Sequence, residues 1–154
     1  MNLIIKSFSE LTSNELYEIM KSREEIFTIG QNIRVLDFDD VDYDAFHCFF
    51  MEGNRVVAYL RAFRSDGPED TMRIGRVLTL KQGLGIGSDL MLKSMRAIKQ
   101  RCACKTFVLD AQIQAVGFYE RLGFAIVSDE FIEAGIPHVT MELKNFKYQK
   151  SECI

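Results

Sequence analysis

The glycine-rich segment at residues 82–88, Gln-Gly-Leu-Gly-Ile-Gly-Ser, constrains the fold more than any other part of the sequence. An apolar stretch typical of a strand, residues 72–80, precedes it. About 14 residues follow in which apolar positions from Met91 to Cys102 recur at helical spacing. A strand, a glycine turn and a helix in this order predict an α/β unit whose first helical amides are exposed. The segment is therefore either a tight turn or a cradle for the phosphates of a ligand.

The spacing of these glycines does not fit two common phosphate-binding motifs. A dinucleotide fingerprint has glycine at its first, third and sixth positions, and the sixth position counted from Gly83 is Ser88. A P-loop has lysine and then serine or threonine after its second glycine, and this segment lacks that pair. A nucleotide-binding α/β protein is therefore the least favoured interpretation.

The rest of the sequence predicts short strands and helices. Thr12 and Glu15 form the pattern of a capping box, which begins a helix expected to run to about Thr28. Gly53-Asn54 lies between two β-rich segments and predicts a hairpin. The expected strands are residues 2–8, 46–52, 55–64, 72–80, 105–110, 124–132 and 138–144. With a third helix at residues 112–122, this order predicts an α/β (α+β mixed sheet) class with helices on the sheet faces.

Length, charge and cysteine content limit the classes of protein to consider. A chain of 154 residues is typical of one domain, which we expect to span residues 1–154. The net charge of −3 argues against a nucleic-acid partner, because proteins that coat phosphates are strongly basic. No apolar run approaches the roughly 20 residues of a membrane span, and Lys6 follows too early for a signal peptide. We therefore expect a cytoplasmic protein with free thiols and no zinc site.

Three positions of the glycine segment match a known signature. Gln82, Gly85 and Gly87 resemble the coenzyme A-binding pattern of the GNAT superfamily of N-acetyltransferases. Residues 115–124, Ala-Val-Gly-Phe-Tyr-Glu-Arg-Leu-Gly-Phe, resemble a second run of that family. Segments that resemble the ElaA-type branch are residues 74–77, Ala111-Gln112 and residues 133–138. The resemblance covers nearly the whole chain and implies the GNAT acyl-CoA N-acyltransferase fold.

The resemblance also implies how acetyl-CoA would bind. Its diphosphate is expected on the backbone amides of Gln82, Gly83, Leu84, Gly85, Ile86, Gly87 and Ser88. Its pantetheine is expected to lie like an added strand along Val77, Leu78 and Thr79. A backbone N–H near Leu78 is expected to face the thioester oxygen. Gln112, which stands where asparagine is common in the family, and Phe118 complete the expected contacts.

Tyr119 occupies the position of the family's general acid, which protonates the departing CoA thiolate. A free thiol has a pKa of about 8.5 and a phenol of about 10, so the proton transfer is feasible without large shifts. The alternative is that Tyr119 is an aromatic residue of the core.

The base that deprotonates the amine is not singled out by the sequence. An alkyl ammonium has a pKa of about 10.4, so the acceptor arrives charged. His47, His138, Glu133 and the aspartates between residues 37 and 44 are candidates, although a lone histidine is commonly structural. Arg61 and Arg76 lie in expected strands, where they could bind a substrate carboxylate or lie on a solvated face.

Five aspartates fall between residues 37 and 44. An EF-hand counted from Asp40 would need glycine at Ala45 and glutamate at Met51, so no metal is expected. The segment could be a solvated loop, as charge runs commonly are. It could instead attract a cationic amine, for which Asp37 and Asp39 are the candidates.

The sequence thus predicts an acetyl-CoA-dependent N-acetyltransferase that acts by direct attack of an amine on the thioester. The fold does not identify the acceptor, which could be a small amine, an amino sugar or a protein amine. The alternative is a non-catalytic acyl-CoA-binding or sensing module, in which Tyr119 would be dispensable. A homodimer through a sheet edge or the last strands remains open, and residues 149–154 are expected to fray.

Overall fold

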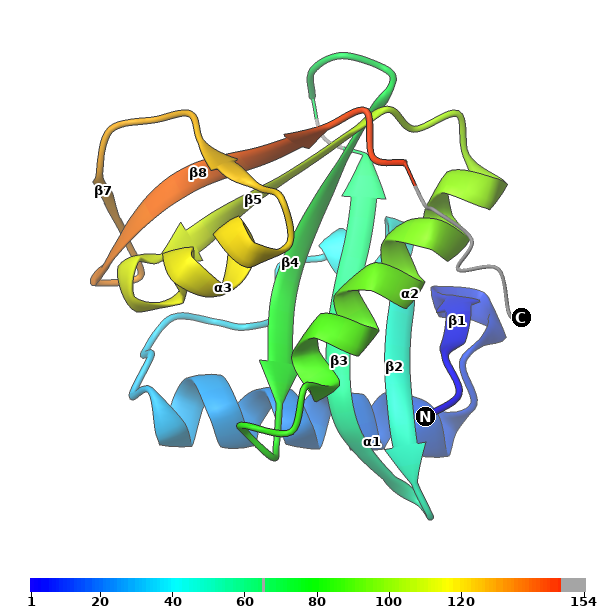
Figure 1. Ribbon diagram of the computed structural model, residues 1–154. Helices are drawn as coiled ribbons and strands as arrows, with labels where there is room; N and C mark the ends of the chain where they lie inside the picture. Colours follow the sequence, from blue (N-terminus) through cyan, green and yellow to red (C-terminus); the bar gives the residue numbers. More distant parts are fainter. Residues whose placement is uncertain (65, 148–154) are drawn as a thin grey trace.

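The computed structural model describes residues 1–64 and 66–147, which contain eight strands and three α-helices (Figure 1). The strands are β1 (Ile4–Ser7), β2 (Phe46–Glu52), β3 (Arg55–Arg64), β4 (Thr71–Thr79), β5 (Thr106–Gln112), β6 (Ala125–Ile126), β7 (Phe131–Glu133) and β8 (Ile136–Lys144). The α-helices are α1 (Ser13–Arg23), α2 (Ile86–Arg101) and α3 (Val116–Arg121). The expected fraying of residues 149–154 concerns residues outside the described part.

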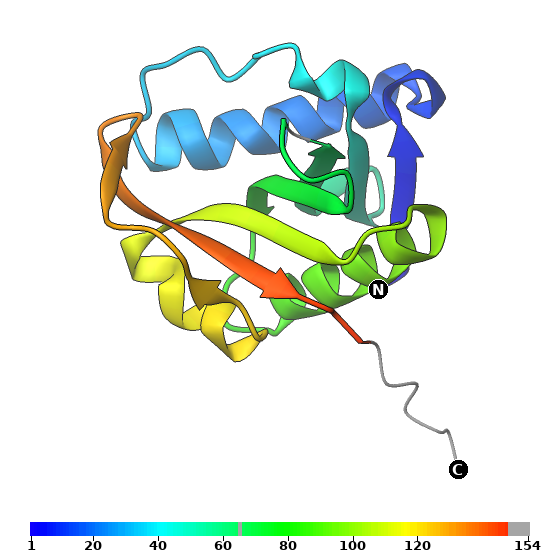
Figure 2. The same cartoon turned by 90° about the horizontal axis from the view of Figure 1, so that it is seen from above.

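The eight strands form one mixed sheet in the order β1-β2-β3-β4-β5-β8-β6, and β7 pairs with β8 beside that path. The β4–β5 pairing is parallel, and the other pairings are antiparallel. Helix α1 covers one face of the sheet, whereas α2 and α3 cover the opposite face (Figure 2). The predicted mixed-sheet class is confirmed. No helix within residues 1–64 and 66–147 is long and apolar enough to cross a bilayer.

Strands β4 and β5 lie side by side for only part of their length. The parallel ladder joins residues 71–73 to residues 106–108. Beyond it β4 continues to Thr79 and β5 to Gln112, and Figure 1 shows the two strands diverging. Backbone groups on the facing edges therefore lose their partners in the sheet, and such groups require other partners.

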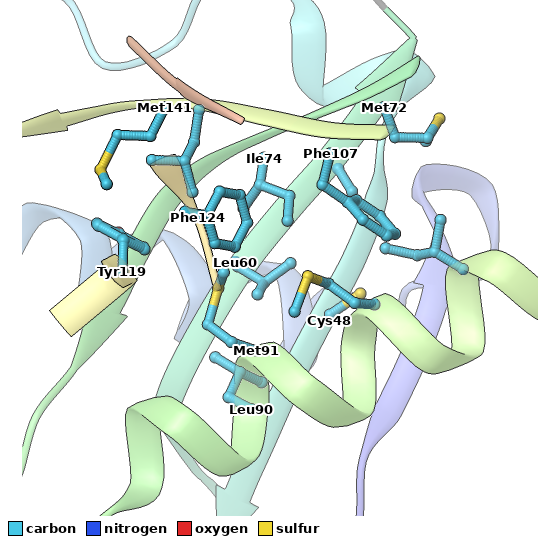
Figure 3. Packing of buried hydrophobic residues seen from close by; sticks show 14 of the residues in the cluster. Cys48, Leu60, Met72, Ile74, Leu90, Met91, Phe107, Tyr119, Phe124 and Met141 are labelled. Carbon is cyan, nitrogen blue, oxygen red and sulfur yellow. The ribbon is translucent and has the colours of Figure 1, made fainter. Parts of the chain in front are cut away.

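Helix α2 packs on the sheet through one apolar face. Met91, Met95 and Ile98 are fully buried, as their spacing predicts. They belong to a cluster that includes Leu60 and Ile74 of the sheet (Figure 3). Each such side chain contributes roughly 1.5–3 kcal/mol when it is fully buried. The cluster fixes α2, and with it the end of the glycine segment, against the sheet.

Helix α1 begins as predicted. The Glu15 amide donates to the Thr12 hydroxyl at 3.1 Å, and the Thr12 amide donates to the Glu15 carboxylate at 2.9 Å, which completes the capping box. After Arg23 the chain continues as a π-helix over Glu24–Gly30, so helical structure reaches slightly beyond the expected Thr28. Such segments are rare and occur often beside functional sites.

Two element predictions in the last third of the chain are wrong. Residues 124–132 do not form one strand, because Ser128 interrupts it: its hydroxyl accepts the Thr140 amide at 2.8 Å in place of a ladder partner. Residues 112–122 do not form one helix. Gln112 ends β5, a 3-10 turn spans Ile113–Ala115, and α3 follows.

Candidate active site

The glycine segment forms an open turn between β4 and α2. Gly83 and Gly85 have φ angles of 78° and 72°, in the left-handed region that glycine adopts without strain. Gly85 caps α2, and its carbonyl accepts the Asp89 amide at 3.1 Å. Among the described residues, no oxygen accepts a hydrogen bond from the amides of residues 83–88. The turn therefore presents a run of free donors at the positive end of a helix, which is an environment that binds phosphate.

Gly87 lies against helix α3. A Cβ atom at this position would lie 3.3 Å from the Phe118 Cζ atom and 3.5 Å from the Thr79 Cγ2 atom. The Phe118 ring thus packs on the backbone of the glycine segment, where a side chain would force it to move. This contact ties the candidate phosphate site to the residue that precedes Tyr119.

A pocket of about 510 Å³ opens where β4 and β5 separate. Its walls come from the second halves of these strands, the chain that follows α1, helix α3 and the β7–β8 turn. This size lies within the roughly 300–1,000 Å³ of small-molecule sites. Of the residues predicted from the sequence, the pocket brings together Asp37, Asp39, Arg61, Arg76, Val77, Gln112, Tyr119, Glu133 and His138.

Tyr119 lines this pocket and is 8 % exposed. Its ring packs edge-on against Phe118 and Phe124, with centroid distances of 5.0 and 5.9 Å, at one end of the core cluster (Figure 3). Burial raises the pKa of the phenol, so the group keeps its proton at neutral pH. No hydrogen bond from another described residue engages its hydroxyl. Tyr119 can therefore donate a proton or a hydrogen bond to a ligand in the pocket.

Strand β4 carries a bulge in the wall of the pocket. In the ladder with β3, Arg61 pairs with Gly75 and Tyr59 pairs with Leu78, so β4 has one extra residue between these pairs. Arg76 lies there with a φ of 53°, which is uncommon outside glycine. Such a conformation costs roughly 1–3 kcal/mol and persists where its surroundings hold it.

A closed ring of six charged side chains, which we call the ion-pair ring, surrounds this bulge. Arginine and aspartate alternate around it in the order Arg23, Asp37, Arg76, Asp39, Arg61 and Asp42. Its six contacts measure between 2.6 and 3.4 Å. Three positive and three negative charges leave the ring neutral. It joins α1, the loop before β2, β3 and β4 at one wall of the pocket.

The ion-pair ring bears on two of the alternatives that the sequence left open. Arg61 is 3 % exposed and therefore does not lie on a solvated face. Asp42 is 6 % exposed, whereas Asp39, Asp40 and Asp44 of the same segment are exposed, so the segment is solvated only in part. The hydrogen bonds from Arg61 lower the pKa of Asp39 to about 2. Burial opposes the ionisation of Asp42, but the hydrogen bonds from Arg23 and Arg61 outweigh it and lower its pKa. These carboxylates are therefore ionised and already paired.

His47 lies outside the pocket and is fully buried. Its Nε2 atom lies 2.8 Å from the Asp42 carbonyl oxygen, which only accepts, so Nε2 carries the hydrogen. Burial lowers the pKa of His47 and keeps the ring neutral, so Nδ1 accepts from the Tyr59 hydroxyl at 2.7 Å. Both ring nitrogens are engaged, so His47 has no free ring nitrogen to act as a base.

Glu133 and His138 face the pocket from the β7–β8 hairpin. The His138 Nε2 atom lies 3.7 Å from the Glu133 Oε2 atom. Gln112, which is opposite His138 in the β5–β8 ladder, donates from its amide to the Gln31 side chain at 2.8 Å. This bond joins the end of β5 to the residue that follows the π-helix.

Sequence reasoning considered Asp42 only as one of the five clustered aspartates, and it did not select Arg23. It also did not select the ion pair between Arg73 and Asp110, which measures 2.9 Å in the pocket wall. A signal existed for Arg23, because it interrupts the apolar face of the first helix and a buried charge requires a partner. No pattern within β4 or β5 distinguishes the Arg73–Asp110 pair from ordinary strand residues.

Comparison with known proteins identifies the family. A family model described as an acetyltransferase (GNAT) domain matches residues 37–145. A UPF0039 protein of Schizosaccharomyces pombe is 34% identical over 148 residues, which are 94% of this chain and 97% of that protein. The crystal structure of Escherichia coli ElaA matches with a TM-score of 0.84 at 30% identity, over 92% of this chain and 97% of that chain.

A second solved structure agrees. The crystal structure of an acyl-CoA N-acyltransferase from Pseudomonas aeruginosa matches with a TM-score of 0.84 at 28% identity. The match covers 92% of this chain and 99% of that chain. The resemblance stated from the sequence, including the ElaA-type branch, is confirmed.

Proposed function

Because the chain belongs to the GNAT acetyltransferase family, whose activity is acyl-CoA-dependent acyl transfer, we propose that it is an acetyl-CoA-dependent N-acetyltransferase. In this reaction an amine attacks the thioester carbonyl, an N–C bond forms, and the C–S bond breaks. The acceptor ammonium must lose a proton before attack, and the departing thiolate must gain one. The products are an N-acetylated amine and free coenzyme A.

The observation that carries this proposal is the run of free amides at residues 83–88. Unpaired donors at a helix N-terminus fit a diphosphate, and these amides would hold that of coenzyme A. The edge of β4 from Val77 to Thr79 extends beyond its ladder with β5. An extended pantetheine arm can pair with such an edge, and the thioester would then reach the pocket.

Tyr119 is the proposed proton donor for the thiolate. Its phenol is protonated at neutral pH, lines the pocket and has no hydrogen-bonding partner among the described residues. It also follows Phe118, which packs on Gly87. The raised pKa of Tyr119 makes complete proton transfer less favourable than for a solvated phenol, so hydrogen bonding to the developing thiolate is part of its proposed role.

The charges of the pocket also indicate which class of amine acts as the acceptor. The ion-pair ring engages Arg61 and Arg76, and Asp110 engages Arg73, so these cations are already neutralised. Glu133, by contrast, forms no ion pair with a lysine or arginine of the described residues and has 56 % of its side chain exposed. An unneutralised carboxylate favours a cation. We therefore propose a cationic alkylamine as acceptor, rather than an amino acid whose carboxylate would need a free arginine.

Calorimetric titration of coenzyme A tests the cofactor site. Gly85→Ala introduces left-handed strain at the cap of α2, whereas Gly53→Ala introduces comparable strain in the β2–β3 turn, away from the site. Neither Cβ atom would meet a neighbour within 4 Å. We expect Gly85→Ala to weaken CoA binding about tenfold, equivalent to roughly 1.4 kcal/mol, with Gly53→Ala unchanged. Equal affinity in all three proteins would contradict the proposed cradle.

A thiol-release assay with acetyl-CoA and a panel of alkylamines tests the reaction itself. Amine-dependent release of free thiol supports the transferase. Tight coenzyme A binding without turnover of any amine would instead support a non-catalytic acyl-CoA-binding module.

A further inference from the structure

The tautomer of His138 is fixed by its position in β8. Its Nδ1 atom lies 2.7 Å from the carbonyl oxygen of Ile136. A carbonyl oxygen only accepts hydrogen bonds, so Nδ1 carries the hydrogen. In the neutral ring the lone pair therefore resides on Nε2. The Phe131 ring stacks on the imidazole at 6.0 Å and an interplanar angle of 21°, which holds the plane of the ring.

This arrangement leaves His138 with a free proton acceptor, unlike His47. Both nitrogens of His47 are engaged by Asp42 and Tyr59. The Nε2 atom of His138 has no donor partner among the described residues, and its nearest charged neighbour is Glu133 Oε2 at 3.7 Å. The His138 Nε2 lone pair and the Glu133 carboxylate repel each other, because no hydrogen atom lies between them. A positively charged N–H group of a ligand that contacts both atoms would relieve this repulsion.

On the premise of the proposed function, we propose that His138 Nε2 is the general base that removes a proton from the acceptor ammonium. Glu133 draws the ammonium to this place and stabilises the imidazolium that forms. The amine nitrogen, now neutral, keeps its lone pair for attack on the thioester carbonyl. The nitrogen loses its second proton as the C–S bond breaks, and this proton replaces the one that Tyr119 gives to the thiolate. The imidazolium later returns its own proton to water, so the overall reaction forms the CoA thiol and releases one proton.

The other charged groups around the pocket do not compete for this proton. Asp110 on β5 is held by Arg73 at 2.9 Å and by the Thr140 hydroxyl at 2.8 Å. Across the pocket, the aspartates of the ion-pair ring each contact two arginines. Tyr119 on α3 remains protonated because burial raises its pKa. Among the described residues of the pocket wall, the Glu133 carboxylate and the His138 imidazole are thus the titratable acceptors that no arginine engages.

His138→Asn tests the assignment without removing the structural hydrogen bond. The amide nitrogen of asparagine can still donate to the Ile136 carbonyl, but the side chain has no basic atom. With cadaverine as acceptor we expect kcat/KM to fall about a hundredfold or more, with the affinity for coenzyme A unchanged. The acid limb of the kcat/KM–pH profile should be lost. With benzhydrazide, which is uncharged at neutral pH, the loss should be much smaller.

Glu133→Gln provides a second variant on the exposed hairpin, and Glu130→Gln is its matched control outside the pocket. We expect Glu133→Gln to raise the KM for cadaverine about tenfold, as loss of roughly one charge contact does, without changing that for benzhydrazide. Glu130→Gln should behave as wild type for both acceptors.

The outcomes separate the two proposals. A wild-type chain that neither binds coenzyme A nor releases thiol contradicts the proposed function itself. A wild-type chain that binds coenzyme A and acetylates neither probe overturns the base assignment together with the acceptor class. Normal cadaverine turnover and an unchanged pH profile in His138→Asn overturn the base assignment alone.

Discussion

Tyr119 owes its position to the way its own short helix ends. The Phe124 amide donates to the Tyr119 carbonyl at 3.1 Å, and the Gly123 amide donates to the Glu120 carbonyl at 3.0 Å. These two bonds form a Schellman motif, and the ring contact between Tyr119 and Phe124 is its usual apolar partner. Gly123 has a φ of 101°, which this motif requires. One glycine therefore orients the proposed acid.

Replacement of Tyr119 by phenylalanine tests the hydroxyl directly. The ring contacts remain, so CoA affinity should be unchanged, while kcat falls about tenfold or more because the thiolate leaves without its donor. Tyr17→Phe is the control, since Tyr17 is 67% exposed on α1 and lies outside this pocket. Full activity of Tyr119→Phe would show that the phenol has no role in turnover.

Gly123→Ala should destabilise the fold more than Gly53→Ala. Both variants place a Cβ atom on a left-handed backbone, at a cost of roughly 1–2 kcal/mol. At Gly123 that atom would also lie 3.1 Å from the Leu143 Cδ1 atom, whereas Gly53 has open space. In urea denaturation we expect Gly123→Ala to lower the free energy of unfolding by about 1–3 kcal/mol more than Gly53→Ala does. Equal losses for the two variants would mean that the Leu143 side chain moves away from the added methyl group at no cost in free energy.

Among the elements, the loop before β2 and the bulge of β4 depend on one shared set of ion pairs. The fully buried Arg23 reaches Asp37 and Asp42 at 2.8 Å each. Arg76 reaches Asp37 at 2.7 Å from the strained bulge. The ion-pair ring thus holds the strained backbone and the loop at the pocket wall together, and loss of one member leaves buried charges unpaired.

Arg23→Met should cost roughly 3–5 kcal/mol in the free energy of unfolding, because Asp42 would remain buried without one of its two cations. Arg55→Met is the comparison, since Arg55 pairs with Glu25 at the surface and 45% of its side chain is exposed. There we expect a loss of less than about 1 kcal/mol. Similar losses for both, measured by urea denaturation, would show that the ion-pair ring adds no more than a surface pair.

The elements also show what the sequence could predict. The start of α1 and the turn before α2 were predictable, because Thr12, Glu15 and the glycines form contacts with residues close to them in the sequence. The break at Ser128 could not be foreseen, because its partner Thr140 lies on another strand. The ion-pair ring was not predictable for the same reason, because its contacts join residues between 14 and 39 positions apart in the sequence.

At the scale of the whole molecule, stability should depend on pH in two stages. Burial lowers the pKa of His47 below its ordinary 6.5, so the unfolded chain binds this proton more readily and stability falls as pH drops below about 6.5. Arg61 lowers the pKa of Asp39 to about 2, so that contribution is complete above about pH 4 and is lost as pH falls towards 2.

Urea denaturation at a series of pH values measures both stages. His47→Gln should remove the first decline, and Asp39→Asn should reduce the second, whatever their effects on stability at neutral pH. Unchanged slopes in these variants would assign the pH dependence to other groups.

The cleft between β4 and β5 belongs to the whole sheet, and no segment of the sequence encodes it alone. The strands themselves were predicted, and so was the family to which the glycine segment belongs. Their separation after residues 73 and 108 was not, because it depends on how β8 and the bulge at Arg76 fit the sheet. The pocket that collects Tyr119, Glu133 and His138 follows from that separation.

The central claim is that coenzyme A binds with its diphosphate on the free amides of the glycine segment and its arm along β4. Titration of the ¹⁵N-labelled chain with coenzyme A, followed by amide chemical shifts, tests it most directly. The largest shifts should fall on residues 83–88 and on the edge of β4 from Val77 to Thr79. Saturable binding that leaves these amides unmoved, or no binding at all, would contradict the account.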